Sequence, residues 1–561
     1  MLIYLVIAPI LFAVLLYLFP TSKISKSIVI VAQALLVAAA FVLFYQSRTN
    51  EISLNIGDYG GFLGITLAVD QLSAIFLILT VVIFFALTIY NIGENNSKFF
   101  WFLLFLLEGT LIGLFLTRDI FNIFVLAEVT TVLGAIFLMY HRIRRSMYDG
   151  LVYLMVNVIV MQFYLFGIGF LYMLTGVLDM DQSALVIATT LDNSQLTLPF
   201  ALIKTAIAAK CSLLPLMTFL PKVHSIPDAP SSVGTILSCL QVKAGIYLFL
   251  RFRHIFQGID ASSFFLILGI ITAVFGIILA LGQTNIKSIL AYSTIAQVGL
   301  IVIGLSLEGT YSYIGSLYHV FSHAIAKATL FLSAGIIMRV YDTLEMSKIK
   351  GVLKEIPVVG FVTILAILSM TGAPLFSGNI SKYFMMSEAN FIIYPIIILI
   401  NLGTITVFIK YATILFGKMP AVTEEEIDEA KATGVLQEDR DNIERTGFFA
   451  KAEAIILRID IFKEIAVVLL AILCLLGGIF GTELIGLLFH YDVVIRFADI
   501  AEKAIIFVCS WGAGYFIYRF AVKKNASLKF IGHLDLNFRT ICVSIGGFFA
   551  LTLLVVGVVL S

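Results

Sequence analysis

The sequence predicts an all-α polytopic membrane protein with about sixteen transmembrane helices. Hydrophobic residues make up 60% of the 561-residue chain and charged residues 13%, against roughly 45–50% and about 25% in soluble domains. The mean hydropathy is +1.05, and a soluble core of this size cannot hide so much apolar surface. Long apolar runs recur along the chain without two-residue alternation, which excludes a transmembrane β-barrel.

Each predicted helix is an apolar run long enough to cross about 30 Å of hydrocarbon, which takes about 20 residues. Helices are required because lipid offers no hydrogen-bond partner to a bare backbone. In chain order the runs span residues 2–20, 28–46, 66–91, 99–116, 119–140, 150–176, 196–221, 231–251, 262–282, 288–306, 311–340, 357–385, 391–417, 463–488, 499–519 and 539–560. The first run has no basic region before it and no small-residue cleavage site, so we expect a transmembrane helix rather than a cleaved signal peptide.

Basic loops predict the orientation of these helices. Lysine and arginine clusters follow the first, fifth, eleventh and fifteenth helices: Lys23 and Lys26; Arg142, Arg144 and Arg145; Lys348, Lys350 and Lys354; Lys523, Lys524 and Lys529. All four clusters fall on one side of the membrane, which the positive-inside rule makes the cytoplasmic side. Both termini and the acidic loops then lie outside. The loop after the eighth helix, with Arg251, Arg253 and His254, is a mild exception.

A polar stretch at 418–462 interrupts the apolar pattern on the predicted cytoplasmic side. Its first part is acidic and solvated, and its second part has the pattern of an amphipathic helix at the membrane interface. A contact with a neighbouring subunit and a plain connector both fit this composition.

Ionisable side chains inside the apolar runs are the main functional signal. They are Glu128 in the fifth helix, Lys204 and Lys210 in the seventh, Lys243 in the eighth, His319, His323 and Lys327 in the eleventh, Lys382 in the twelfth and Lys410 in the thirteenth. Each costs at least about 2.5–3.5 kcal/mol at mid-membrane, so such residues mark an ion path or a paired structural contact. Glu108 is also intramembrane, but the sequence offers it no partner.

The spacing of three of these residues predicts a short proton ladder. His319, His323 and Lys327 lie at i, i+4 and i+8, which stacks them on one helix face about 6 Å apart per step. Histidine exchanges protons near neutral pH. A lone histidine would more simply be a packing residue, and Lys204 or Lys410 could extend to the interface instead of belonging to a path.

Helix breakers beside two lysines predict an internal repeat. Pro215 and Pro221 follow Lys210, whereas Gly372, Pro374 and Gly378 precede Lys382. We therefore predict five-helix units at 99–253 and 254–417, each with a broken helix, flanked by N-terminal helices at 1–98, the connector at 418–462 and C-terminal helices at 463–561. An odd number of helices per unit makes the two units inverted.

The remaining composition excludes several kinds of site. Five cysteines lie scattered in apolar runs without a CxxC pair or a His–Cys cluster, so we expect no metal and no cofactor in this chain. The net charge of +1 gives no indication of nucleic-acid binding.

Several motifs resemble the antiporter-like subunit family of complex I, Mrp Na⁺/H⁺ antiporters and membrane-bound hydrogenases. They are LTRDIFNIFVLAEV, AAKCSLLPLMTFLPKVHSIPDAPSSVGTILSCLQVKAGIY, NIKSILAYSTIAQVGLI, YHVFSHAIAKATLFLSAG and GAPLFSGNISK. The similarity covers about residues 60–417, and the fifth-helix motif is most similar to the D-type subunits of Mrp antiporters. Met217, Lys222 and Asn285 depart from the family pattern at helix ends and loops.

The resemblance implies a role for each motif residue. Glu128 would be the essential glutamate that pairs with Lys210, the broken-helix lysine. Lys243 would connect to His319 and His323, with Lys327 nearby, and Lys382 would exchange protons with the far side.

The resemblance also implies a proton-conducting subunit that couples H⁺ and Na⁺ movement in the plasma membrane of a prokaryote. Its partners would be antiporter-like and small Mrp-type membrane subunits, and in a redox-driven pump also peripheral redox subunits, because this chain has no nucleotide, flavin or iron–sulfur motif. Two other interpretations stay open: a stand-alone transporter or channel, and a structural membrane subunit. Transport by the single purified chain would favour the first, and intact coupling after neutralisation of Lys210 the second.

Overall fold

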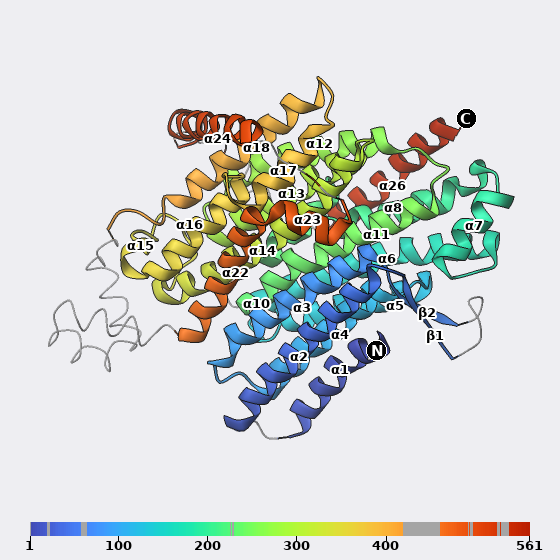
Figure 1. The fold of residues 1–561 in the computed structure, drawn as a ribbon, viewed down its shortest axis with the longest axis horizontal. Helices are drawn as coiled ribbons and strands as arrows, with labels where there is room; N and C mark the ends of the chain where they lie inside the picture. The colour runs from blue at the N-terminus through green and yellow to red at the C-terminus, as the bar shows by residue number, and fades with distance from the viewer. Residues whose placement is uncertain are drawn as a thin grey trace.

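The computed structural model describes residues 2–19, 23–57, 64–224, 226, 229–418, 460–491, 493, 497–523, 525, 528 and 538–560. These residues form a bundle of long helices, and both ends of the chain lie toward the same side as the small β-hairpin (Figure 1). Most of the stretch predicted as a polar connector, 418–462, lies outside the described residues.

Every predicted apolar run contains a helix. The long helices are α1 (Leu2–Leu18), α2 (Lys23–Ser47), α3 (Gln71–Ile92), α4 (Lys98–Leu116), α5 (Ile120–Leu138), α6 (Arg144–Thr175), α8 (Thr197–Lys210), α11 (Val242–Ile255), α12 (Ser262–Gly282), α13 (Ile286–Ser306), α14 (Thr310–Tyr341), α16 (Pro357–Thr371), α17 (Ser377–Ser387), α18 (Ile393–Ala412), α22 (Ile461–Ile479), α24 (Phe497–Ile517) and α26 (Phe538–Leu560). Within the described ranges, 13 helical spans are long and apolar enough to cross a membrane, and α1 and α16 are shorter apolar helices.

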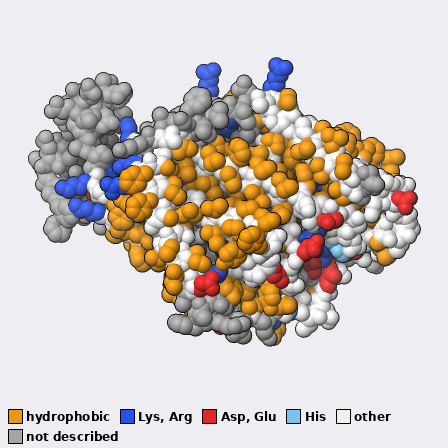
Figure 2. All heavy atoms as spheres, turned by 90° about the horizontal axis from the view of Figure 1, so that it is seen from above, with side chains coloured by type: hydrophobic (Ala, Val, Ile, Leu, Met, Phe, Trp, Pro, Cys, Tyr) orange, Lys and Arg blue, Asp and Glu red, His pale blue; other side chains and the backbone are white. Residues whose placement is uncertain are grey.

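Short elements complete the fold. They are the antiparallel hairpin β1 (Ile52–Ile56) and β2 (Ile65–Val69), α7 (Met180–Thr190), α9 (Phe219–His224), α10 (Ser231–Ile236), α15 (Val352–Glu355), α23 (Gly481–Phe489) and several single turns. The hairpin and α7 were not predicted, because they are too short to stand out from the apolar pattern. The prediction for residues 66–69 was wrong: they form β2 and not the start of the third helix, which begins at Gln71. Hydrophobic side chains cover most of the face in Figure 2, and charged side chains gather in patches toward its ends.

Both predicted helix breaks are confirmed. The first separates α8 from α9, and Lys210 is the last residue of α8. The second separates α16 from α17, with Gly372 at φ 80° as the left-handed C-cap of α16. Lys382 lies in α17, after its break, whereas Lys210 lies before its own.

The eighth predicted helix is continuous but not regular. A π-helical turn, Leu237–Gln241, joins α10 to α11. π turns inside α-helices are rare and are frequent at functional sites.

Elements recur along the chain in the same order. An isolated bridge joins Asp119 to Asp179 around α5 and α6, and another joins Asn285 to Glu345 around α13 and α14. Each residue of the second bridge lies 166 residues after its counterpart in the first. α6 and α14 both have 32 residues, and a broken helix follows each of them.

An ion cluster ties the hairpin side of the bundle together. Asp70, the N-cap of α3, accepts hydrogen bonds from Arg251 of α11 at 2.6 and 2.7 Å and lies 3.1 Å from Arg118. Burial would raise the pKa of Asp70, but the hydrogen bonds and charges of Arg251 and then Arg118 hold it below its usual range. Arg251, the mild exception to the loop pattern, therefore has its charge balanced inside the fold.

Candidate functional site

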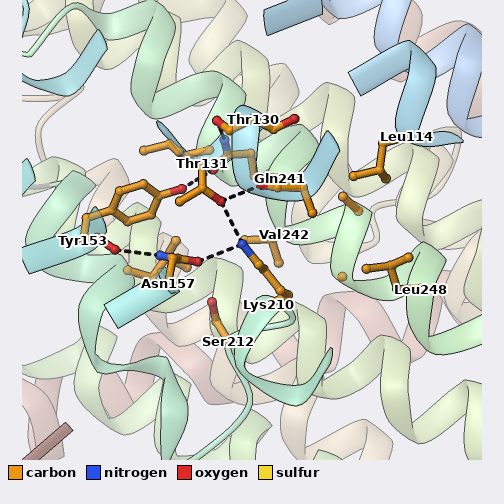
Figure 3. A pocket seen from close by; sticks show the side chains of 15 residues that line it. Leu114, Thr130, Thr131, Tyr153, Asn157, Lys210, Ser212, Gln241, Val242 and Leu248 are labelled. Atoms are coloured by element: carbon orange, nitrogen blue, oxygen red, sulfur yellow. Dashed lines mark hydrogen bonds between the residues drawn. The ribbon is translucent and has the colours of Figure 1, made fainter. Parts of the chain in front are cut away.

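Lys210 bonds neutral oxygens on two neighbouring helices. Its ammonium group donates to Thr131 Oγ1 of α5 at 2.8 Å and to Asn157 Oδ1 of α6 at 3.1 Å (Figure 3). The chain leaves α8 directly after Lys210, where Ser212 adopts a φ of 56°. The break thus places a lysine at a helix end inside the bundle, where its cation suits the carbonyl end of the helix dipole.

A small cavity of about 40 Å³ adjoins this ammonium group. Tyr153 lines it and donates to Gln241 Oε1 at 2.5 Å, and Gln241 Nε2 donates to the Thr130 carbonyl at 3.1 Å (Figure 3). A water needs only about 10–15 Å³ of such volume and two or more polar partners. The site therefore has room and hydrogen-bonding groups for water next to Lys210.

Glu128 lies one helical turn before Thr131 but does not contact Lys210. Among the described residues no ion pair within 4.0 Å joins the two, and the buried Oε1 atom of Glu128 has no hydrogen-bond partner. The structure thus brings both residues to one region of α5 and α8, with Thr131 rather than Glu128 holding the lysine.

Lys243 is fully buried at the π turn. Its ammonium group donates to the Ser238 carbonyl at 2.7 Å. The Ser238 hydroxyl lies 2.9 Å from the Thr294 hydroxyl of α13, and Thr294 in turn donates to the Leu290 carbonyl at 3.0 Å. The site therefore continues from the first predicted unit into the second.

Lys327 joins this chain of contacts from the other side. Its ammonium group donates to the same Leu290 carbonyl at 2.7 Å and to Ser293 Oγ at 2.5 Å. Lys327 thus bonds α13 directly, whereas Lys243 bonds Ser238, whose hydroxyl contacts α13.

The two predicted ladder histidines have different surroundings. His319 contacts Ser381 Oγ through Nδ1 at 2.8 Å and Gln297 Oε1 through Nε2 at 3.0 Å. His323 is buried with both ring nitrogens unpartnered in the described part of the chain, and its ring centroid lies 6.0 Å from that of His319. The predicted placement of His319 and His323 one turn apart on the same face of α14 is confirmed.

Lys382 follows Ser381 in α17 and is the last in a row of lysines that also includes Lys210, Lys243 and Lys327. Its ammonium group donates to Asn401 Oδ1 of α18 at 2.7 Å and to the Met370 carbonyl at the end of α16 at 2.8 Å. Like Lys210, it bonds one side-chain amide beside a helix break.

Lys204 and Lys410 are buried as well, with 3% and 7% of their surface exposed. Lys410 donates to the carbonyls of Leu281 and Gln283 at the end of α12, which is the position of a C-capping cation. Lys204 lies 4.5 Å from the Phe249 ring centroid and 3.4 Å from the Phe249 carbonyl. Both ammonium groups therefore have partners within the fold.

Several polar residues of the site were not predicted. They are Thr131, Asn157, Gln241, Gln297, Ser381, Asn401 and His224, whose two buried ring nitrogens have no partner in the described ranges. An amide inside an apolar helix was the available signal, but it is weaker than a charge. Glu108 also gains a partner, since Gln33 of α2 donates to its Oε1 at 2.5 Å.

No metal site is evident within the described ranges, where His, Cys, Asp and Glu form no group of three or more with suitable geometry. The arrangement offers protons a row of amines, imidazoles, hydroxyls and amides.

Comparisons with known proteins agree with this geometry. Residues 117–409 match the family described as NADH:quinone oxidoreductase/Mrp antiporter, TM. The D subunit of the Na⁺/H⁺ antiporter of Alkalihalophilus pseudofirmus is 29% identical over 66% of this chain and 78% of its own length. The N subunit of the NADH-quinone oxidoreductase of Desulforudis audaxviator is 30% identical over 58% of this chain and 66% of its own length.

Two solved structures share the fold. A chain of the Mrp complex from Dietzia sp. superposes with a TM-score of 0.75 at 21% identity, covering 90% of this chain and 99% of that one. A chain of the membrane-bound sulfane sulfur reductase, an archaeal respiratory membrane complex, gives 0.73 at 22% identity, covering 91% and 98%.

Proposed function

The chain belongs to the transmembrane family of NADH:quinone oxidoreductases and Mrp antiporters, and on that basis we propose that it is a proton-conducting subunit of a multisubunit membrane complex. Its established relatives include Na⁺/H⁺ antiporter subunits. The proposed role is to move H⁺ across the membrane so that Na⁺ movement elsewhere in the complex is coupled to it.

The observation that carries this proposal is a set of four lysines, three buried and Lys210 partly buried, that bond neutral oxygens. Lys210, Lys243, Lys327 and Lys382 form no ion pair with a carboxylate in the described part of the chain. A buried ammonium that pairs with a carboxylate is held in its charged form, whereas one bonded to hydroxyls and amides can release its proton more readily. A purely structural role explains four such lysines poorly, because placing each charge inside the membrane costs free energy.

The proposed path runs through both units. Glu128 would influence Lys210 through its charge without direct contact, and movement of that carboxylate would change the proton affinity of the lysine. Protons would pass through water between Lys210 and Lys243, then through Ser238 and Thr294 toward Lys327. His323 and His319 would lead to Lys382, which exchanges with the far side.

We also propose that the two units are inverted copies within about sixteen transmembrane helices, with the basic loops in the cytoplasm. The recurrence of α5–α6 as α13–α14, each followed by a broken helix, supports the repeat. Both ends of the chain lie on the hairpin side, as this orientation requires. The plasma membrane is the expected location.

The proposed partners are other antiporter-like and small membrane subunits of the same complex. The fold of the respiratory complex chain also fits a redox-driven pump, in which electron carriers belong to peripheral subunits. Na⁺ is assigned to a neighbouring subunit, because in the described part of this chain His, Cys, Asp and Glu form no group of three or more that could hold a metal ion.

The test is H⁺ and Na⁺ flux in vesicles that carry the intact complex, with Lys210→Ala, Glu128→Ala and Lys210→Arg. Arginine keeps the charge but does not deprotonate in proteins. We expect all three variants to assemble on a native gel and to lose coupled flux. Normal flux in Lys210→Arg together with loss in Lys210→Ala would show that only the charge matters, and normal flux in every variant would overturn the proposal.

A further inference from the structure

A large polar cavity opens between α3, α10, α14 and α22. Its volume is about 940 Å³, which is room for tens of waters. Tyr140 and His141 line it at the end of α5, directly before the basic cluster that begins at Arg142. The cavity therefore belongs to the basic-loop side of the bundle.

An ion cluster from three distant segments lies at the mouth of this cavity. Lys463 of α22 donates to Glu94 Oε1 at 2.5 Å, and Arg339 of α14 donates to the same atom. Burial would raise the pKa of Glu94, but the hydrogen bond and charge of Lys463 and the charge of Arg339 lower it. Glu94, in the turn after α3, is thus a carboxylate held by two cations.

The start of α22 fits closely against that same turn. A Cβ atom on Gly93 would lie 1.2 Å from the Asp460 carboxylate, the N-cap of α22. Asp460 therefore packs against this turn and Lys463 bonds its Glu94, which attaches the start of α22 to the turn after α3.

At the inner end of the cavity, α3, α10 and α14 pack closely together. A Cβ atom on Gly335 would lie 2.2 Å from Ser231 Oγ and 3.0 Å from the Tyr90 hydroxyl. Tyr90 in turn donates to the Leu332 carbonyl at 3.3 Å. Polar groups from α3, α10 and α14 thus form the floor.

Two of these helices lead directly to the row of lysines. Along α14, Lys327 lies eight residues before Gly335, about 12 Å at 1.5 Å per residue. Along α10 and the π turn that follows it, Ser238 lies seven residues after Ser231, about 10 Å away, and its carbonyl accepts the hydrogen bond from Lys243. The floor therefore approaches one lysine of each unit, at the boundary between the units.

We propose that this cavity is the water-filled entrance through which protons reach the lysine row from the basic-loop side, and that the Glu94–Lys463 pair controls access to it. The proposal rests on the proposed function. While both cations bond Glu94, α22 stays fastened to the turn after α3. Release of Lys463 leaves Glu94 with Arg339 alone and frees the start of α22, which widens the mouth.

The first test measures water access without any transport. Single cysteines at Ser231 and Ala229, both on the cavity wall, are placed in a background with the five native cysteines replaced. Ser333→Cys is the matched control, because Ser333 is a fully buried serine of α14 that does not line the cavity. A membrane-impermeant thiol reagent is added to either side of vesicles that carry the intact complex.

We expect Ser231→Cys and Ala229→Cys to react at least tenfold faster than Ser333→Cys, and only from the basic-loop side. Absence of labelling at both wall positions, or labelling from the opposite side, would overturn the entrance. This outcome does not depend on flux, so it separates failure of the entrance from failure of the proposed function.

The second test addresses the ion pair. We expect Lys463→Met to raise the labelling rate of Ser231→Cys severalfold, whereas Lys503→Met, which loses a lysine bonded to Tyr394 away from this cavity, leaves it unchanged. An unchanged or slower rate in Lys463→Met would overturn the role of the pair. Labelled Ser231→Cys should also lose at least tenfold in coupled H⁺ flux, and full flux after complete labelling would contradict the entrance.

Discussion

Lys210 and Lys382 have the same local arrangement. Each ammonium group ends beside a helix break and donates to a side-chain amide, Asn157 in one case and Asn401 in the other. An amide oxygen stabilises the charged lysine by a hydrogen bond but adds no negative charge. The proton is therefore bound less firmly than in a buried ion pair, which suits a group that must both accept and release it.

The hydrogen bonds that Lys210 donates lead to a prediction about single residues. We expect Thr131→Val combined with Asn157→Leu to reduce coupled flux at least tenfold, because each hydrogen bond to a charged group contributes about 1.5–3 kcal/mol. The measurement is H⁺ flux in vesicles. Thr205→Val is the control, because Thr205 is buried in the same helix as Lys210 but its hydroxyl donates to its own helix at Ala201; equal loss in this control would contradict the assignment.

The Asp70 cluster predicts an effect on stability. Asp70→Asn leaves the buried Arg251 without its countercharge and Arg118 with Glu51 alone, and we expect a loss of about 3–5 kcal/mol, seen as a lower thermal midpoint of the purified complex. Asp260→Asn, at an exposed helix start, should cost at most about 2 kcal/mol.

The pH dependence of the Asp70 cluster follows from the direction in which the pKa of Asp70 is shifted. The folded pKa of Asp70 lies below the ordinary value of 3.8. Its stabilising contribution is therefore complete above about pH 4 and is lost as the pH falls further, through the folded pKa. A difference in thermal midpoint between wild type and Asp70→Asn that stays constant as the pH falls below 4 would contradict this assignment.

At the scale of elements, two helices meet where the chain breaks. Gly245 of α11 packs on the end of α8, and a Cβ atom there would lie 2.7 Å from the Cys211 nitrogen and from the Lys210 carbonyl carbon. The π turn directly before α11 turns Lys243 toward its own backbone at Ser238. Backbone irregularities in α8 and α11 thus position two lysines of the row.

We expect Gly245→Ala to push α11 away from α8, to cost about 1–3 kcal/mol and to reduce coupled flux strongly. Flux and thermal midpoint are measured together. Gly169→Ala is the control, since a Cβ at Gly169 of α6 meets nothing within 4 Å. Normal flux in Gly245→Ala would mean that the close packing does not position Lys210.

At the scale of the whole molecule, α13 connects the two units. Its Thr294 contacts Ser238 of the first unit, and its Leu290 carbonyl accepts from Lys327 of the second. Gln297 of the same helix contacts His319. Polar contacts of the two halves therefore meet on α13.

If protons follow a single path, the effects of two substitutions in that path on flux should not add. We expect Lys210→Ala and Lys382→Ala each to abolish coupled flux, and the double variant to be no worse than either, because residues in one path act as a unit. Two independent paths would instead leave each single variant with about half of the wild-type flux. Vesicle flux at equal complex content distinguishes the two cases.

The sequence by itself determined the helical membrane fold, both helix breaks and the buried ionisable residues. These features are local: apolar length, proline or glycine at a break, and a charge inside an apolar run are all visible along one helix. The high free energy of burying a charge makes each such residue conspicuous without knowledge of its neighbours.

Only the tertiary structure decided what each residue contacts. The family resemblance implies that Lys210 and Glu128 form a pair, yet Thr131 and Asn157 hold the lysine, and Lys410 caps α12. The Glu94 cluster joins segments hundreds of residues apart. Such contacts depend on how helices far apart in sequence pack side by side, and hydropathy, which is summed along one helix at a time, carries no information about which helices become neighbours.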